Sequence, residues 1–136
     1  MATRRTFLKQ TAGASVAVAG MTSSAASFAR ILGANDRLGV GIIGLGRRLK
    51  AFVPPISDSN NNLDLLYLCD VMKSQRTSAA ALFSEHMSHS AKLENDIRKV
   101  IDDPKVDVIF NATPDHWHAP GTIMALKGGK HVYVEK

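Results

Sequence analysis

The sequence is poor in cysteine and in aromatic residues, and each shortage excludes a class of protein. Cys69 is the single cysteine among 136 residues, so no disulfide can form within the chain. Phe, Trp and Tyr make up only 6% of the sequence and are not interleaved with a stripe of Lys and Arg, which argues against nucleic-acid binding. The hydrophobic fraction of 45% is nevertheless sufficient for a packed core of ordinary size. We therefore expect one ordinary domain with no disulfide and no nucleic-acid partner.

Acidic residues are absent from the first thirty positions, which hold four of the seventeen basic residues. Beyond these positions thirteen basic residues stand against twelve acidic ones, so the formal charge of +5 belongs almost entirely to the leader. Thr3–Lys9 (TRRTFLK) and the uncharged stretch after it have the basic, weakly apolar and small-residue parts of a secretory signal. The paired Arg4 and Arg5 resemble the twin-arginine export motif.

We accordingly expect a signal peptide over residues 1–29 and a linker over 30–37, with a dinucleotide-binding domain over 38–136. The apolar part of the leader is too weakly apolar for a membrane span, which needs about 20 strongly apolar residues. The twin-arginine machinery would then export the protein to the periplasm or cell envelope of a bacterium. An ordinary amphipathic helix at the N-terminus is the alternative interpretation.

The stretch Leu38–Leu49 (LGVGIIGLGRRL) begins with an unbroken apolar run and ends in a glycine turn. A run without polar alternation is typical of a strand covered on both faces of a parallel sheet. Gly44 and Gly46 are the first two glycines of a G-x-G-x-x-G loop, which brings a pyrophosphate close to backbone N–H groups at a helix N-terminus. The third glycine is missing, because Leu49 stands in its place. This departure concerns how closely the helix packs on the strand more than the phosphate contacts.

A dinucleotide-binding fingerprint also needs a second strand that ends in an acidic residue about 20 positions further on. Leu63–Cys69 (LDLLYLC) supplies that strand, and Asp70 follows it directly. A carboxylate there bonds the adenosine ribose and repels a 2′-phosphate, which favours NAD, although Lys73 and Arg76 leave NADP open. The sequence therefore predicts dinucleotide binding, with a strand that merely ends in a glycine turn as the alternative.

The remaining sequence alternates short strands with helices of about ten residues. We expect a short or kinked helix from Arg47 to Pro54 and Pro55, a helix capped by Ser74, a short strand at Leu93, and a helix with Ile97, Val100 and Ile101 inside. Next come a strand over Val106–Ala112, a helix with Pro120 in its first turn and Ile123, Met124 and Leu126 inside, and a strand over His131–Val134. This alternation predicts an α/β fold, a Rossmann-type parallel sheet with helices on both faces.

In such a sheet ligands bind at the carboxyl ends of the strands, where residues 44–48, 70–73, 113–118 and 135–136 should meet. The segment 113–118 (TPDHWH) is the most unusual of the four. We favour contacts from its histidines to the nicotinamide end of a dinucleotide or to its substrate. A structural role, with Trp117 as a core plug, is one alternative. A metal held by His116 and His118 is another, but no cysteine or spaced carboxylate completes a ligand set, so we predict no metal site.

The motifs GIIGLG, LCD and ATPDHWHAPGTIMALKGGKHVYVEK together resemble the N-terminal domain of the glucose-fructose oxidoreductase and inositol dehydrogenase family, particularly its twin-arginine-exported bacterial members. The resemblance covers essentially the whole chain. It implies three groups of cofactor-binding residues, at the pyrophosphate, the adenosine ribose and the nicotinamide end. These are Gly44, Leu45, Gly46, Arg47 and Arg48; Asp70; and Thr113, Pro114, His116 and His118. Glu135 and Lys136 match the start of a Glu-Lys-Pro motif whose lysine assists proton transfer or orients the nicotinamide ribose.

The family's second domain, an α+β unit with a mostly antiparallel sheet that forms the substrate wall, is absent from this sequence. The chain thus resembles a truncated product or fragment, and a homo-oligomer is expected only with that domain. For the complete enzyme we expect hydride transfer between NAD(P) and a sugar or cyclitol hydroxyl carbon, with Lys136 as the catalytic base. The alternatives are an NAD-dependent glycoside hydrolase of the same fold and a non-catalytic nucleotide-binding remnant.

Overall fold

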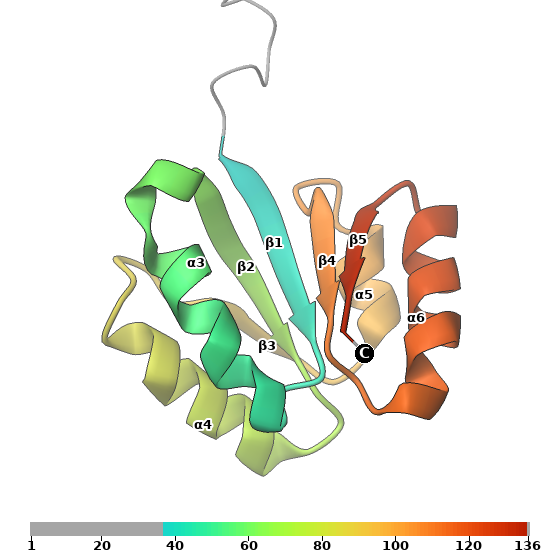
Figure 1. Cartoon of the computed structure of the whole chain (residues 1–136), viewed down its shortest axis with the longest axis horizontal. Coiled ribbons are helices and arrows are strands. Elements are labelled where there is room, and N and C mark those ends of the chain that lie inside the picture. The colour runs from blue at the N-terminus through green and yellow to red at the C-terminus, as the bar shows by residue number, and fades with distance from the viewer. Residues whose placement is uncertain (1–36, 136) are drawn as a thin grey trace, which may run out of the picture. The chain divides into compact units, whose positions relative to one another are not determined.

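Five parallel strands form the sheet in the computed structural model, which describes residues 37–135 of the chain. The strands are β1 (Leu38–Ile43), β2 (Leu63–Cys69), β3 (Lys92–Glu94), β4 (Val108–Asn111) and β5 (His131–Val134). Their order is β3-β2-β1-β4-β5, and every neighbouring pair is parallel, so all carboxyl ends lie at one edge (Figure 1). This arrangement confirms the predicted Rossmann-type sheet.

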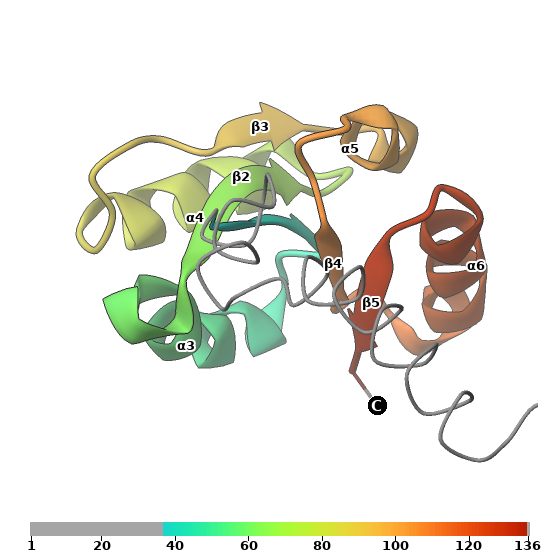
Figure 2. The same ribbon diagram turned by 90° about the horizontal axis from the view of Figure 1, so that it is seen from above.

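Helices cover both faces of the sheet (Figure 2). The helical segments are η1 (Arg47–Phe52), α3 (Val53–Ser57), η2 (Ser59–Asn61), α4 (Lys73–Ser84), α5 (Ile97–Asp102) and α6 (Asp115–Lys127). One core cluster lies under η1, α3 and α4 and includes Val40 and Ile42 of β1, while Ile43 belongs to the cluster under α5 and α6. A strand that serves two cores needs apolar residues in both directions, which explains the unbroken apolar run in the sequence.

The first helical segment is short and mixed, as expected. A 3-10 helix, η1, passes directly into α3, which begins at Val53 and has Pro54 and Pro55 in its first turn. Proline is tolerated there because the first N–H groups of a helix have no partner within it. Leu49, in the place of the third glycine, is buried in the core with Phe52 and Ile56, so the segment that follows the glycine loop is held by apolar side chains.

Three details of the expected helices are wrong. Ser74 does not cap α4, which already begins at Lys73 and has no side-chain hydrogen bond at its cap. Pro120 is not in the first turn of α6, because that helix starts at Asp115. The side of α6 that faces the sheet also differs from the expected one. Gly121 and Ala125 are buried, whereas Ile123 and Leu126 are 52% and 58% exposed rather than inside.

The expected signal peptide over 1–29, the expected linker up to residue 36 and Lys136, the expected catalytic base, lie outside the described residues. Within residues 37–135, no helix has both the length and the apolar character needed to cross a membrane.

Candidate functional site

The carboxyl ends of the strands open into a cleft of about 1220 Å³. Pockets for small ligands usually measure ~300–1,000 Å³, so this cleft has room for a molecule of dinucleotide size. Its walls include residues from each of the four segments expected there. From the predicted site they are Gly44, Gly46, Arg47, Arg48, Asp70, Thr113, Pro114, His116, His118 and Glu135.

The strand order explains why the cleft forms at this place. The chain runs outward from β1 through β2 to β3, then returns to the other side of β1 with β4 and β5. Loops that follow β1 and β4 therefore leave the sheet in opposite directions, which creates a crevice between them. The glycine loop after β1 and the loop before α6 form the two sides of this crevice.

Gly44 fits this crevice only because it has no side chain. Its φ is +83°, a left-handed conformation that residues with a Cβ rarely adopt. An added Cβ would lie 2.5 Å from Thr113 N and 2.6 Å from Ala112 O, so the two loops touch at this point. Gly46 differs, since a Cβ there would meet nothing within 4 Å. Its backbone therefore borders open space in the cleft, as a close approach of a phosphate group requires.

The Asp70 carboxylate holds two turns at the adjacent strand end. One oxygen, Oδ2, accepts a hydrogen bond of 2.8 Å from the N–H of Leu45, and Oδ1 accepts one of 2.8 Å from the N–H of Met72. The glycine loop and Asp70 thus lie at the same edge of the sheet. Each carboxylate oxygen has two lone pairs, so both retain the capacity to accept a hydroxyl hydrogen. The Leu45 side chain is buried in the core, and its N–H is engaged by Asp70 rather than turned to the cleft.

The loop after β4 and the first turn of α6 form the opposite wall. Thr113, Pro114, His116 and His118 line the cleft together with Trp117. Trp117 is 46% exposed, which contradicts the alternative interpretation of this residue as a core plug. Among residues 37–135, no cluster of three or more His, Cys, Asp or Glu side chains is arranged to hold a metal ion.

A buried asparagine, which the sequence analysis did not single out, organises this wall. Asn111 is fully buried at the end of β4. Its Oδ1 accepts from Thr113 Oγ1 at 2.7 Å, and its Nδ2 donates to the His118 carbonyl at 3.0 Å and to Thr122 Oγ1 at 3.3 Å. Gly121 leaves the space that the amide occupies, because a Cβ there would lie 2.9 Å from Nδ2. An amide side chain directly after the apolar residues VIF was the available signal.

Two charged residues from the predicted site pair with each other. Arg48 Nε lies 2.9 Å from Glu135 Oε1, and the Tyr133 hydroxyl donates to the same oxygen at 3.0 Å. The hydrogen bond to Glu135, followed by its negative charge, raises the pKa of the Arg48 guanidinium. The Glu135 N–H also donates to the Asn111 carbonyl at 3.0 Å, which fixes its backbone to β4.

Cys69 lies beside Asp70 but has the properties of a core residue. It is buried at the end of β2, and burial, followed by the nearby charges of Glu94 and Asp70, raises the pKa of its thiol to about 12. A thiol with such a pKa stays protonated at neutral pH and is a poor nucleophile. The buried position agrees with an ordinary packing role.

Residues 38–136 match the GFO/IDH/MocA family, described as an oxidoreductase family with an NAD-binding Rossmann fold. A glycosyl hydrolase family 109 protein of Saccharopolyspora erythraea is 32% identical over 97% of this chain and 32% of its own length. The scyllo-inositol 2-dehydrogenase (NADP(+)) of Bacillus subtilis is 27% identical over 74% of this chain and 26% of its own length. The chain thus spans about a third or less of the length of these curated relatives.

Solved structures show the same fold. The myo-inositol dehydrogenase of Lactobacillus casei, in complex with NAD(H) and myo-inositol, matches with a TM-score of 0.65 at 23% identity, over 74% of this chain and 28% of its own. The WlbA dehydrogenase of Bordetella pertussis, in complex with NADH and UDP-GlcNAcA, matches with a TM-score of 0.64 at 23% identity, over 74% of this chain and 29% of its own.

Proposed function

The chain belongs to the oxidoreductase family with the NAD-binding Rossmann fold, and from this premise we propose that it is the cofactor-binding part of an NAD(P)-dependent dehydrogenase. The proposed substrate is a hydroxyl group of a sugar or cyclitol. The observation that supports this proposal most is the convergence of the glycine loop, Asp70 and the segment 113–118 on one cleft of sufficient size. The dehydrogenases for inositol and sugar derivatives among its relatives point to the same class of substrate.

Different parts of the cleft wall suit the pyrophosphate, the adenosine ribose and the nicotinamide of a dinucleotide. The open backbone at Gly46, at the start of η1, suits a pyrophosphate, whereas the Leu45 N–H is already bonded to Asp70. Asp70 would accept the ribose hydroxyls, and the same carboxylate would repel a 2′-phosphate, which favours NAD over NADP. NADP is the alternative cofactor, because the relative from Bacillus subtilis is an NADP(+) enzyme. Thr113, Pro114, His116 and His118 would then flank the nicotinamide end.

When bound, the nicotinamide supplies the hydride acceptor for oxidation of the substrate carbon. The protein has to hold substrate and cofactor in contact and to remove the hydroxyl proton. We assign the proton transfer to Lys136, which lies outside the described residues, because it follows Glu135 at the end of β5. The preceding residue, Glu135, lines the cleft, and its backbone N–H is bonded to the Asn111 carbonyl of β4.

Titration of the purified full chain with NADH tests the first part of the proposal. We expect saturable enhancement of NADH fluorescence, with tighter binding of NADH than of NADPH. Asp70→Ala should reduce the difference between the Kd for NADH and the Kd for NADPH. Asp58→Ala serves as the matched control, because Asp58 caps η2 away from the cleft. No fluorescence change at millimolar nucleotide would contradict cofactor binding and favour the non-catalytic remnant.

A second candidate function is NAD-dependent glycoside cleavage, in which the sugar is oxidised transiently and the bound cofactor returns to its starting state. The glycosyl hydrolase family 109 relative, which aligns with 97% of this chain, favours it. Assays on a full-length enzyme that includes this chain distinguish the two functions. Release of an aryl alcohol from an aryl glycoside without net NADH indicates the hydrolase, and net NADH from a free sugar indicates the dehydrogenase.

We also propose that residues 1–29 direct export by the twin-arginine route, with 30–37 as a linker to the domain over 38–136. Arg4 and Arg5 precede a weakly apolar, uncharged stretch, as this route requires. A reporter fused after residue 37 should reach the periplasm in a bacterium. Replacement of both arginines with lysine should retain the reporter in the cytoplasm, and equal export of both fusions would contradict the proposal.

A further inference from the structure

Arg47 and Arg48 are neighbours at the start of η1, and both line the cleft, but their surroundings differ. Arg47 is exposed, and its side chain makes no hydrogen bond or ion pair within the described part of the chain. Arg48 is paired through Nε with Glu135, at 2.9 Å. One arginine is therefore available to an anionic ligand, and the other is already engaged.

The carboxylate that holds Arg48 is poorly accessible to water. The Glu135 side chain is 10% exposed, against 58% for Arg48. Its Oε1 also accepts from the Tyr133 hydroxyl. Transfer of the guanidinium to a phosphate would break its charge-assisted contact of 2.9 Å with this poorly exposed carboxylate. This cost opposes the use of Arg48 as a phosphate ligand.

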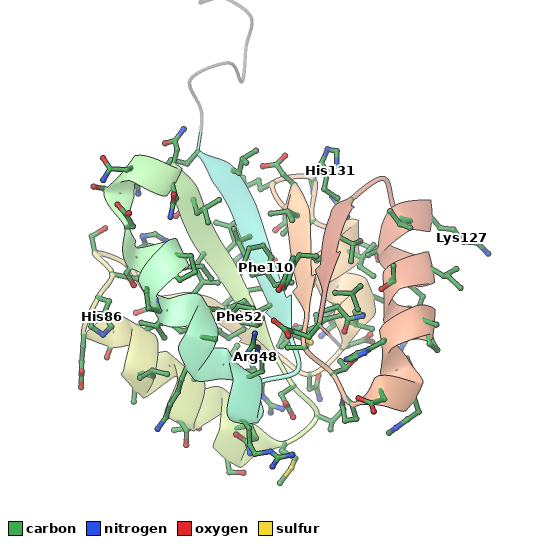
Figure 3. All side chains as sticks on the ribbon, viewed as in Figure 1. Arg48, Phe52, His86, Phe110, Lys127 and His131 are labelled. Carbon is green, nitrogen blue, oxygen red and sulfur yellow. The ribbon has the colours of Figure 1, made fainter. Side chains whose placement is uncertain are left out.

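Aromatic packing beneath the ion pair ties the same segments together. Phe52 of η1 lies 5.4 Å from Phe110 of β4 and 6.1 Å from Tyr133 of β5, between ring centroids, and Phe110 lies 5.6 Å from Tyr133. Figure 3 shows Arg48 and Phe52 on the same side of the sheet as Phe110. The segment η1 thus contributes both the cation and a ring to contacts with the last two strands.

We infer that Arg48 is a positioning residue, which holds the segment after the glycine loop to the end of β5 through Glu135, and that Arg47 is the arginine available to the phosphates of a dinucleotide. The inference rests on the proposed function and deepens it. Its physical content is preorganisation: the ion pair keeps the pyrophosphate loop and the end of β5 at a fixed separation before the cofactor binds.

A double-mutant cycle with NADH as the probe tests this division of roles. Arg48→Met, Glu135→Gln and their combination are compared in the full chain by fluorescence titration, with Arg47→Met as the matched control in both backgrounds. We expect Arg48→Met to raise the Kd for NADH about fivefold in the wild-type background and by less than about twofold with Glu135→Gln present, because the two residues act as a unit. Arg47→Met should raise the Kd by the same factor in both backgrounds. Long-range effects of the removed charges largely cancel in such a cycle.

The inference is overturned if Arg48→Met weakens NADH binding by the same factor with and without the Glu135 carboxylate. Failure of the wild-type chain to bind NADH would instead overturn the proposed function. In that case the urea midpoints of the same four variants are measured. Arg48→Met should lower the midpoint in the wild-type background and should lower it much less when Glu135→Gln is present. Additive losses of stability there would overturn the positioning role.

Discussion

The absence of a side chain at Gly44 is a requirement of both backbone and packing. Its φ of +83° disfavours any residue with a Cβ, and the added atom would meet the backbone of Ala112 and Thr113. We expect Gly44→Ala to reduce the free energy of unfolding by about 2 kcal/mol or more, as measured by urea denaturation. It should also weaken NADH binding, because the loop must move to relieve the contact.

Gly129 provides the control for this substitution. Its φ is +74°, but a Cβ there would meet nothing within 4 Å. Gly129→Ala should therefore show only the conformational part of the loss, ~1–2 kcal/mol, and should leave NADH binding unchanged. Equal losses in the two variants would contradict the argument that the contact between the glycine loop and Thr113 constrains the site.

We expect the Asn111 side chain to contribute more to the free energy of unfolding than an exposed asparagine does. Asn111→Leu keeps the approximate volume but removes an acceptor from Thr113 and a donor to the His118 carbonyl, both partly buried. We expect a loss of about 2–3 kcal/mol in the free energy of unfolding, since buried polar groups left without partners each cost ~1–3 kcal/mol. Asn61→Leu, at an exposed amide bonded to the Pro55 carbonyl, should cost less than about 1 kcal/mol. Comparable losses would show that Asn111 does not organise the wall.

Site residues whose place depends on where a strand ends could be predicted from the sequence. Contacts that depend on the orientation of two distant side chains could not. Gly44 and Asp70 follow apolar strands directly, and their place at the sheet edge depends only on where those strands end. The pairing of Arg48 with Glu135 joins residues 87 positions apart and depends on which way two side chains point. No periodicity in the chain encodes that direction.

The elements themselves divide in the same way. The predicted bounds of β2 agree with the structure, because Leu63–Cys69 is an apolar run between polar residues. The helix α6 was placed too late, at Pro120, because proline is common in a first turn. In the structure Pro120 lies inside the helix, and the Asn111 side chain of β4 bonds the His118 carbonyl in the part of the helix that precedes this proline. This hydrogen bond comes from a strand, so the sequence of the helix alone could not predict it.

The short helix α5 offers a test of pH dependence. Asp96 caps it, since its Oδ1 accepts from the Arg98 N–H at 3.0 Å and Oδ2 lies 2.7 Å from the Arg98 guanidinium. The side-chain bonds from Arg98, followed by its backbone N–H, lower the pKa of Asp96 to about 2. Because an unfolded Asp titrates near ~3.9, the stabilisation is complete above that pH and is lost as the pH falls towards about 2.

Asp96→Asn should therefore flatten the decline of the urea midpoint between pH 5 and pH 2.5, in ~0.5-unit steps, relative to the wild-type chain. Asp102→Asn is the control on the same helix, because Asp102 acts on Arg98 only through its charge and makes no hydrogen bond or ion pair among the described residues. Its profile should follow the wild type. A profile of Asp96→Asn identical to the wild type would show that the cap contributes nothing in this pH range.

Across the whole sheet, parallel strands and a central β1 bring chain segments far apart in sequence to one edge. That property follows from topology alone, which is why the sequence could predict the meeting of residues 44–48, 70–73 and 113–118. A single bound molecule of dinucleotide length should then contact all three segments at once. Binding at one loop alone would involve a smaller ligand or a different function.

Amide hydrogen exchange in the presence of saturating NADH distinguishes these cases. We expect slower exchange in all three segments together, with the same dependence on NADH concentration, since one binding event protects each of them. The segment 86–91, which joins α4 to β3 and does not line the cleft, should exchange at an unchanged rate and serves as the internal control. Protection of 113–118 without protection of 44–48 would separate the two walls, and the glycine loop would then have no part in holding the cofactor.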